Sequence, residues 1–417
     1  MRILHLNATD LDGGAARGAF WLHKALEAQG ADSIMLVDRK YGTDSSVLGS
    51  SGVMARLSTT VRGQLDRLPL RRYRKTDDSY WTVGWVPRHV ESLVRRCHPD
   101  IVHLHWTGSG FLPIGAFERF RRPLVWTLRD MWAFTGGCHY TAGCERYRKA
   151  CGACPQLRSS VEKDLSRYIW QRKQRHWRGL NLWLVPLSNW LAECARASAL
   201  FRDRPITVIP NGLDIGRFAP TDKTLAKELL GLPTDKQLIL YGAIGSMRDP
   251  RKGFSKLVES LTHFCQRNRP QRIELVIFGD TPRQTAPTAG LKTHFLGHVE
   301  DDERLALLYS SAEVMVVPSL QEAFGKTLIE AMACGTPVVA FNACGPADII
   351  GHREDGYLAR PFCARDLADG IAWCLAEADR LRVLGQRARA KVEAEYDIEI
   401  IAQRYRSLYQ QILDRAG

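Results

Sequence analysis

An α/β protein of two doubly wound parallel-sheet domains is the fold that this sequence predicts. The chain has 417 residues, more than one hydrophobic core usually serves, so two domains are expected. In both halves, short apolar runs alternate with stretches of helical periodicity, which is typical of parallel sheets covered on both faces. The composition, 45% hydrophobic and 25% charged, is ordinary for a globular protein.

The first half opens as a strand, a glycine-bearing loop, a helix and a second strand. Strand Arg2–Leu6 runs through Gly13 and Gly14 into apolar helical spacing over Ala19–Ala28, and the next strand is expected over Ser33–Val37. Further buried strands are expected over Asp100–Trp106, Pro123–Leu128 and Asn181–Leu187.

The second half repeats this alternation. We expect strands over Gln237–Gly242, Ile273–Gly279, His294–Leu296, Val314–Pro318 and Pro337–Phe341. Helical patterns fall over Lys256–Arg267, Asp302–Ser310, Lys326–Cys334 and Ile398–Leu413. These elements predict an N-terminal domain over residues 1–200 and a C-terminal domain over 201–395. A last helical segment over 396–417 is free to pack back on the N-terminal domain.

The charge of the chain narrows the class of partner. A formal net charge of +13 favours nucleic acid, a phosphate-rich substrate or an acidic membrane surface. No secretory signal and no long apolar segment stand out, so we expect a cytoplasmic protein that can lie peripherally on the inner membrane face. The arginine-rich segment Arg56–Lys75 is either a solvated basic face or a patch that touches anionic lipid headgroups.

Residues 319–337 carry the pattern with the clearest chemistry. Gly325 allows the backbone to approach a ligand, and a helix that starts at Lys326 offers free N–H groups to an anion. A diphosphate at that helix start would lie between Glu330, which can accept hydrogen bonds from ribose hydroxyls, and Glu322, which can accept them from a sugar. The predicted donor site comprises Phe324, Gly325, Lys326, Thr327 and Glu330, with Gly279 at the end of a neighbouring strand.

The spacing of Glu322 and Glu330, with the residues around them, resembles the E-x7-E pattern of retaining GT-B glycosyltransferases of family 4. The resemblance implies two Rossmann-like domains that face a cleft, a nucleotide diphosphate sugar as donor, and transfer with retention of anomeric configuration. Val208–Asp214 and Asp249–Phe254 resemble the family's interdomain linker and basic loop, so the resemblance covers most of the chain.

The same resemblance assigns the reacting side. Lys252 resembles the family's lysine at the donor diphosphate, where a fixed ammonium stabilises growing negative charge. Arg248 is the expected second cation, and Arg251 is the alternative. Arg129 occupies the family's histidine slot; because it stays protonated, it is expected to bind phosphate or sugar rather than act as a base. Gly13 and Gly14 resemble the glycine-rich first loop beside the donor phosphates or the acceptor. The helix dipole and basic side chains then neutralise the phosphates, so no catalytic cofactor is expected.

Four cysteines gather in an insertion at residues 136–157. Cys138, Cys144, Cys151 and Cys154 can surround a structural zinc ion, with His139 as an alternative fourth ligand. The segment resembles an insertion of the exopolysaccharide and colanic-acid branch of family 4. Free thiols or a redox pair are the alternatives.

The predicted function is therefore transfer of a sugar from a nucleotide sugar to a glycan, with a lipid-linked polysaccharide intermediate as the expected acceptor. A basic, zinc-bound nucleic-acid-binding protein is one alternative. Another enzyme of the same fold, such as an epimerase or a phosphorylase, is the second. The donor motif has no role in a nucleic-acid-binding protein, so nucleic acid is not an expected partner.

Overall fold

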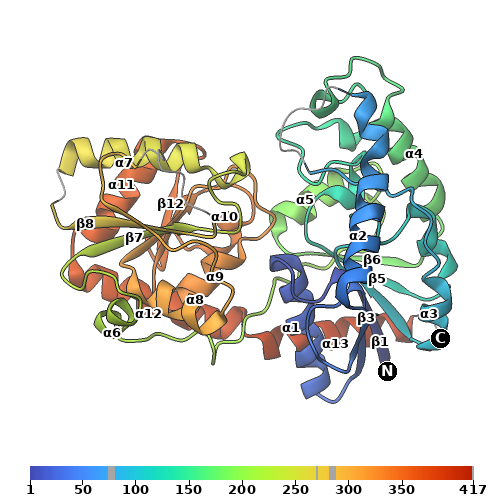
Figure 1. Cartoon of the computed structure of the whole chain (residues 1–417), viewed down its shortest axis with the longest axis horizontal. Helices are drawn as coiled ribbons and strands as arrows, with labels where there is room; N and C mark the ends of the chain where they lie inside the picture. The colour runs from blue at the N-terminus through green and yellow to red at the C-terminus, as the bar shows by residue number, and fades with distance from the viewer. Residues whose placement is uncertain (74–79, 269–270, 281–287, 416–417) are drawn as a thin grey trace. The chain divides into compact units, whose positions relative to one another are not determined.

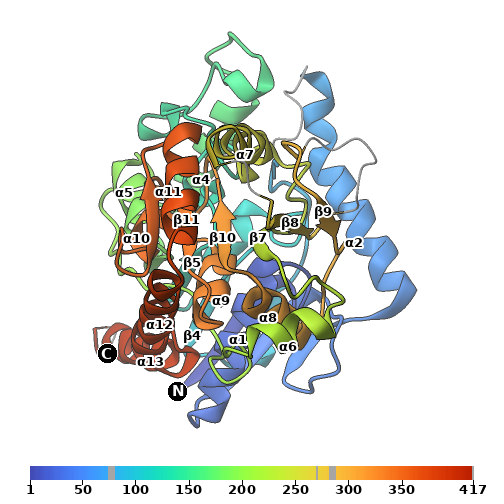
Figure 2. The same cartoon turned by 90° about the vertical axis from the view of Figure 1, so that its left-hand side faces the viewer.

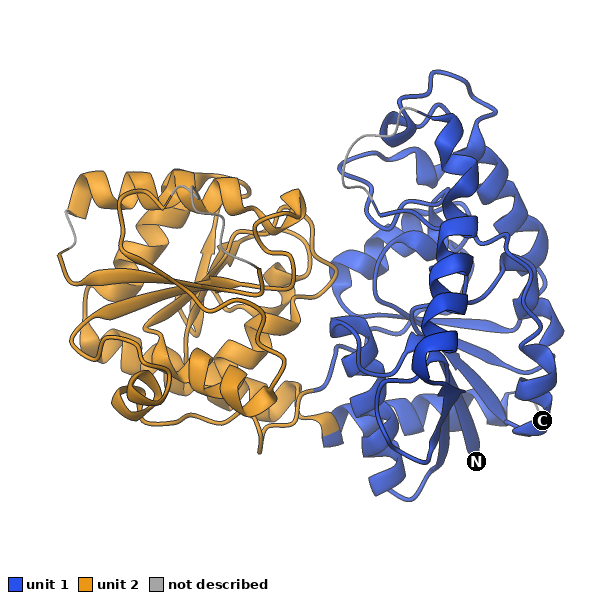
Figure 3. Ribbon diagram, viewed as in Figure 1, with its two compact units in different colours: residues 1–212, 399–417 blue, residues 213–398 orange. Residues whose placement is uncertain are grey.

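A computed structural model describes residues 1–73, 80–268, 271–280 and 288–415. The chain divides into two compact units, each with its own parallel sheet (Figures 1 and 3). Unit 1 comprises Met1–Gly212 with Glu399–Gly417, and unit 2 comprises Leu213–Ile398. The predicted α/β class of two doubly wound sheets is confirmed. Within the described ranges, no helix combines the length and the apolar character that crossing a bilayer requires.

The sheet of unit 1 has six parallel strands in the order β3-β2-β1-β4-β5-β6. The strands are β1 (Arg2–Thr9), β2 (Asp32–Arg39), β3 (Val47–Ser50), β4 (Ile101–Leu104), β5 (Leu124–Leu128) and β6 (Leu182–Pro186). The helices are α1 (Gly14–Ala28), α2 (Gly52–Arg67), α3 (Glu91–Arg96), α4 (Leu165–Trp177), α5 (Asn189–Ala197) and α13 (Ile398–Asp414). β1 pairs with β2 on one side and β4 on the other, and it is almost fully buried, which explains its apolar sequence.

The sheet of unit 2 has the order β12-β11-β10-β7-β8-β9. Its strands are β7 (Gln237–Gly242), β8 (Ile273–Phe278), β9 (Thr293–Phe295), β10 (Val314–Val317), β11 (Val338–Phe341) and β12 (Gly356–Ala359). Its helices are α6 (Lys223–Leu229), α7 (Phe254–Asn268), α8 (Asp302–Ser311), α9 (Lys326–Ala333), α10 (Pro346–Ile349), α11 (Ala364–Leu375) and α12 (Ala378–Glu395). Helices α7 and α11 cover one face of this sheet, while α8, α9 and α12 cover the other (Figures 1 and 2).

Both sheets reverse their strand order at one place. In unit 1 the reversal lies between β1 and β4, and in unit 2 it lies between β7 and β10. Loops that leave the carboxyl ends of two such strands diverge to opposite faces, which opens a crevice where ligands of doubly wound sheets bind. The fold thus marks one candidate ligand position in each unit.

The predicted boundary at residue 200 is too early. Unit 1 extends to Gly212 because the chain after Pro205 pairs with β6: the Leu184 N–H donates to the Pro205 carbonyl at 3.0 Å, and the Thr207 N–H donates to the Leu184 carbonyl at 3.0 Å. Unit 2 runs to Ile398 rather than residue 395, and α13 belongs to unit 1.

Two edge strands were absent from the prediction. β3 exposes most of its residues, and β12 is a four-residue strand that opens with glycine, so neither shows the apolar run of a central strand. The predicted helix over Ala19–Ala28 starts earlier, at Gly14.

Candidate active site

The strand reversal of unit 2 brings together a lysine and a glutamate from two loops. Lys252 follows β7 and Glu322 follows β10, and the Lys252 Nζ donates to the Glu322 Oε2 at 2.6 Å. The Leu320 N–H donates to the Arg251 carbonyl at 2.7 Å, which ties the two loops together beside the pair. Burial alone would raise the pKa of Glu322, but the charge and hydrogen bond of Lys252 outweigh it and lower that pKa. Glu322 is therefore an ionised acceptor at neutral pH.

Helix α9 begins directly after this loop. Gly325 has a φ of 100°, and a Cβ there would lie 2.5 Å from the Leu328 side chain, so the turn into the helix requires glycine. Lys326 and Thr327 form the half-buried first turn, at the positive end of the helix dipole. This geometry suits an anion.

Glu330 lies one turn into α9 and is only 4% exposed. Its Oε1 pairs with the Lys326 Nζ at 3.0 Å, and its Oε2 accepts from the Tyr309 hydroxyl at 2.7 Å. The residue predicted to hold ribose is thus oriented from both sides. Tyr309 was not singled out from the sequence, because only the packing of α8 against α9 reveals it.

At two positions of the site, close backbone packing leaves room only for glycine. Gly253 has a φ of 72°, and a Cβ there would lie 1.9 Å from the Pro318 carbonyl oxygen. Gly279 has a φ of 84°, and its Cβ would lie 2.2 Å from the Ala243 carbonyl oxygen. The loops after β7, β8 and β10 therefore interlock through backbone contacts that only glycine allows. Gly279 was predicted as a donor contact, and Gly253 was not singled out.

Phe324 and Arg248, both predicted site residues, each have a partner within unit 2. The Phe324 ring is buried, and its centroid lies 6.0 Å from that of Tyr396. The Arg248 Nε pairs with the Asp280 Oδ1 at 3.0 Å, and its side chain is 60% exposed. Arg251 pairs with Asp249 within its own loop.

Arg129 and Asp130 separate into two roles in unit 1. The Arg129 guanidinium donates to the Asn211 Oδ1 at 2.9 Å and lies 3.3 Å from the His105 Nδ1. It forms no ion pair with a carboxylate among the residues that the structure describes. Burial lowers the pKa of Arg129 to about 10, so the group stays charged at neutral pH. Asp130, by contrast, accepts from the His139 Nδ1 at 2.7 Å.

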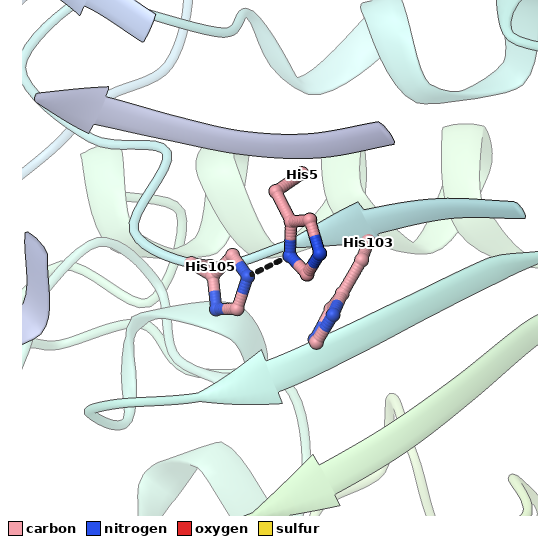
Figure 4. A group of neighbouring side chains, drawn as sticks. All are labelled: His5, His103 and His105. Atoms are coloured by element: carbon pink, nitrogen blue, oxygen red, sulfur yellow. Dashed lines mark hydrogen bonds between the residues drawn. The ribbon is translucent and has the colours of Figure 1, made fainter. Parts of the chain in front are cut away.

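Beside Arg129 lies a buried cluster of three histidines, His5, His103 and His105, from β1, β4 and the residue after β4 (Figure 4). The His5 Nδ1 and the His105 Nε2 are 2.9 Å apart, and His103 bonds the hydroxyls of Thr127 and Tyr409, each at 2.7 Å. Their ligand atoms lie close enough together to hold a metal ion. However, these hydrogen bonds already use most of the ring nitrogens, and the buried Arg129 guanidinium lies beside the rings. Burial lowers the pKa of all three rings well below its ordinary value, so they form a neutral support beneath Arg129.

A cavity of about 530 Å³ lies at the strand reversal of unit 1. The loops after β1 and β4 and the inner face of α2 form its walls. Its lining combines aromatic rings with charged groups, namely Tyr41, Tyr80, Trp106, Asp12, Asp38, Arg39 and Arg67. Gly13 caps α1 nearby with a φ of 87°, and no atom lies within 4 Å of a Cβ built on it or on Gly14. The glycine loop therefore leaves open space at the start of α1.

The four cysteines of the insertion line one small cavity. No three of their sulfur atoms lie within 4.8 Å of one another, which is wider than the sulfur spacing around a tetrahedral zinc ion. Burial raises the pKa of Cys151 to about 12. The structure places the four thiols around one cavity, and His139 is bonded to Asp130 and Thr82. The zinc site stays a prediction.

The two doubly wound sheets define a two-unit α/β protein with a candidate ligand position at the strand reversal of each unit. Comparison with known families is more specific. Residues 12–217 match the family "Glycosyltransferase Family 4", and residues 222–391 match "Glycosyl transferases group 1". A D-inositol 3-phosphate glycosyltransferase of Xylanimonas cellulosilytica is 31% identical over 318 residues, which cover 70% of this chain and 67% of that relative. The chain belongs to this family of glycosyltransferases.

Other relatives are similar over less of their length. A D-inositol 3-phosphate glycosyltransferase of Nocardia farcinica is 29% identical over 307 residues, 70% of this chain and 62% of the relative. A phosphatidyl-myo-inositol mannosyltransferase of Mycobacterium leprae is 29% identical over 257 residues, 61% of this chain and 66% of the relative. The chain thus spans from 62% to 67% of the length of these three relatives.

Solved structures share the fold. Sucrose-phosphate synthase from Thermosynechococcus elongatus matches with a TM-score of 0.69 at 22% identity and covers 100% of both chains. Anabaena HepE in complex with UDP and glucose matches with a TM-score of 0.66 at 20% identity over 99% of this chain and 100% of that chain. The GT-B prediction agrees with these neighbours.

Proposed function

We propose that the protein is a glycosyltransferase that moves a sugar from a nucleotide diphosphate sugar to an acceptor hydroxyl with retention of configuration. One observation carries the proposal: Lys252, Glu322 and the start of α9 meet at the strand reversal of unit 2. A fixed ammonium, an ionised carboxylate and a helix start are the groups that a departing diphosphate and its sugar require.

The Lys252 ammonium stabilises the leaving group. Negative charge grows on the diphosphate as its bond to the sugar breaks, and an ammonium already held in place needs no rearrangement to meet it. Glu322 holds the ammonium and, because it stays ionised, accepts hydrogen bonds from sugar hydroxyls with its remaining lone pairs. Arg248 and Arg251 place further positive charge on the same loop.

Glu330 is the proposed ribose contact. Tyr309 and Lys326 fix its carboxylate, so ribose hydroxyls would meet an acceptor of defined orientation. The first-turn N–H groups near Lys326 and Thr327 would receive the phosphates.

The cavity of unit 1 is the proposed acceptor site. Its aromatic rings suit the apolar face of a sugar, and Arg39 and Arg67 suit a phosphate. All three of these relatives are named for compounds that contain inositol phosphate, and one of the compounds is a phosphatidyl lipid. We therefore assign a phosphate-bearing acceptor, in the form of a lipid-linked glycan at the inner membrane face. We also propose that the protein belongs to the exopolysaccharide branch of family 4 and that Arg129 contacts phosphate or sugar.

A thermal-shift panel of UDP-, GDP- and ADP-sugars tests the donor, because a ligand that binds only the folded state raises its melting temperature. One nucleotide class is expected to stabilise the wild type and to lose its effect in the Glu330→Ala variant. Lys256→Ala, which removes an exposed pair with Glu259, is the control. No response to any sugar nucleotide would falsify the proposal. Retention is checked by the anomeric proton coupling of the product, and an inverted product would refute it.

Zinc is tested separately by elemental analysis. One equivalent per chain is expected in the wild type, and Cys154→Ser should lose it. A metal-free protein with full activity would remove zinc from the proposal.

A further inference from the structure

Helix α2 carries an apolar stripe on its outer side. Six apolar residues lie along one face of the helix or at its edge, five within α2 and one directly after it. Their side chains are between 41% and 77% exposed: Val53, Met54, Leu57, Val61, Leu65 and Leu68. Figure 2 shows α2 as a long helix at the margin of unit 1. An exposed row of this kind on one helix indicates an interaction surface.

The opposite face of α2 is firmly anchored. Ala55 and Asp66 are buried, and the Asp66 carboxylate accepts the N–H groups of Val83 and Gly84 at 2.9 and 2.8 Å. Arg62 pairs with Asp38. The helix cannot roll to hide its apolar stripe without breaking these bonds, so the stripe faces outward by construction.

Basic side chains flank the stripe. Arg56, Arg71 and Arg72 are exposed, whereas Asp66, the one acidic residue between positions 51 and 73, is buried. At the C-terminal end, Trp85 is partly exposed and its Nε1 donates to the Leu65 carbonyl at 3.1 Å. A helix that lies in a membrane interface has these features: leucines and valines that face outward, arginines at the rim and a tryptophan at the end.

We propose that the apolar stripe of α2 docks into the surface of an anionic lipid bilayer. The helix of 16 residues is about 24 Å long and would lie parallel to the surface. The positive rim without an exposed carboxylate is complementary to anionic headgroups. A partner protein would need to match both a purely apolar row and this one-sided charge. The sequence indicated the arginines of 56–75 with leucines and Val61 between them, and the structure adds that these apolar residues are exposed along one helix. Arg74 and Lys75 lie outside the described residues.

The inner side of α2 connects this surface to the acceptor cavity. Thr59, Thr60, Gly63, Gln64 and Arg67 line the cavity of unit 1. A docked α2 therefore holds the cavity next to the headgroups, where a lipid-linked acceptor presents its polar part. This connection rests on the proposed function, whereas the docking itself does not.

Vesicle flotation tests the docking with two kinds of vesicle, phosphatidylglycerol mixed with phosphatidylcholine, and phosphatidylcholine alone. The wild type is expected to float with the anionic vesicles at low salt. Leu57→Asp with Val61→Asp should reduce the bound fraction about tenfold or more, because two carboxylates then face the interface. Leu225→Asp with Leu229→Asp on α6 is the matched control, since these leucines are also exposed and four apart, and it should float like the wild type.

Three results would overturn the docking. The first is a wild type that stays in solution with anionic vesicles, and the second is an α2 variant that floats like the wild type. The third is a dimer of the free protein that dissociates only in the α2 variant. The last result, read by light scattering, would make a second copy the occupant. A melting temperature equal to that of the wild type shows that the α2 variant is folded. Its unchanged response to the nucleotide sugar separates loss of docking from failure of the proposed function.

Discussion

Lys252 and Glu322 lie 70 residues apart in sequence and are joined by a hydrogen-bonded ion pair of 2.6 Å. The pair spans the strand reversal of unit 2, because one residue follows β7 and the other follows β10. It fixes a positive charge where a diphosphate would leave and keeps the partner carboxylate ionised.

Lys252→Met should abolish most of the transfer without unfolding unit 2. Loss of a preorganised charge that stabilises a leaving group typically lowers kcat by about 100-fold or more. Methionine keeps the length of the side chain, so the expected change is in kcat at saturating donor, measured by release of the nucleotide diphosphate. Lys256→Met, on an exposed pair of α7, should retain full activity. Equal kcat in the two variants would contradict the role of Lys252.

Tyr309→Phe should weaken donor binding while kcat stays close to that of the wild type. The change removes one hydroxyl that donates to the buried Glu330 carboxylate, a bond worth about 1.5–3 kcal/mol. Calorimetric titration with the nucleotide measures the affinity, which should fall about tenfold or more. Tyr357→Phe removes a comparable bond to Asp366 elsewhere in unit 2, and its donor affinity should not change. If both variants bind alike, Tyr309 does not orient the ribose contact.

Gly253→Ala should cost unit 2 far more stability than Gly231→Ala. Both glycines have a positive φ, 72° and 66°, so each substitution carries a backbone cost of about 1–2 kcal/mol. Only at Gly253 would the new Cβ meet a carbonyl oxygen, that of Pro318 at 1.9 Å, whereas no atom lies within 4 Å at Gly231. Urea unfolding should show an additional loss of at least about 2 kcal/mol at Gly253. A similar loss at both positions would refute the close approach of the two loops.

Unit 1 should lose stability as the pH falls from 7.5 to 5.5. His5, His23, His103 and His105 have a lowered pKa when folded, about 4 for His23, against about 6.5 in the unfolded chain. Below pH 6.5 these histidines therefore bind protons in the unfolded chain, whereas in the folded chain they stay neutral. The stability that is present above that pH is then lost. Each ring should contribute about 1 kcal/mol over this interval.

Urea unfolding at the two pH values measures the effect. His23→Gln should remove about a quarter of the difference, since one of four such rings is gone. His298→Gln replaces an exposed histidine and should leave the difference unchanged. A stability that does not depend on pH in the wild type would show that the buried rings are protonated when folded.

Local patterns were sufficient to predict the central strands. β1, β7 and β10 are buried on both sides, so their sequences are continuous apolar runs. Edge strands β3 and β12 have weaker patterns and were missed. The unit boundary was placed too early because pairing of the chain after Pro205 with β6 is a long-range contact that no local signal announces.

The sequence by itself determined the two-sheet class and the helix start at Lys326, because strand and helix periodicity are local properties. It predicted Lys252, Glu322 and Glu330 as site residues through the resemblance to family 4. Only the tertiary structure decided which groups meet: Lys252 with Glu322, Tyr309 with Glu330, and Arg129 with the histidine cluster. It also decided that the apolar side of α2 faces outward, since that depends on the anchoring of Asp66 by a distant segment. Contacts between residues far apart in the chain arise from the packing of whole elements, which spacing along the sequence does not encode.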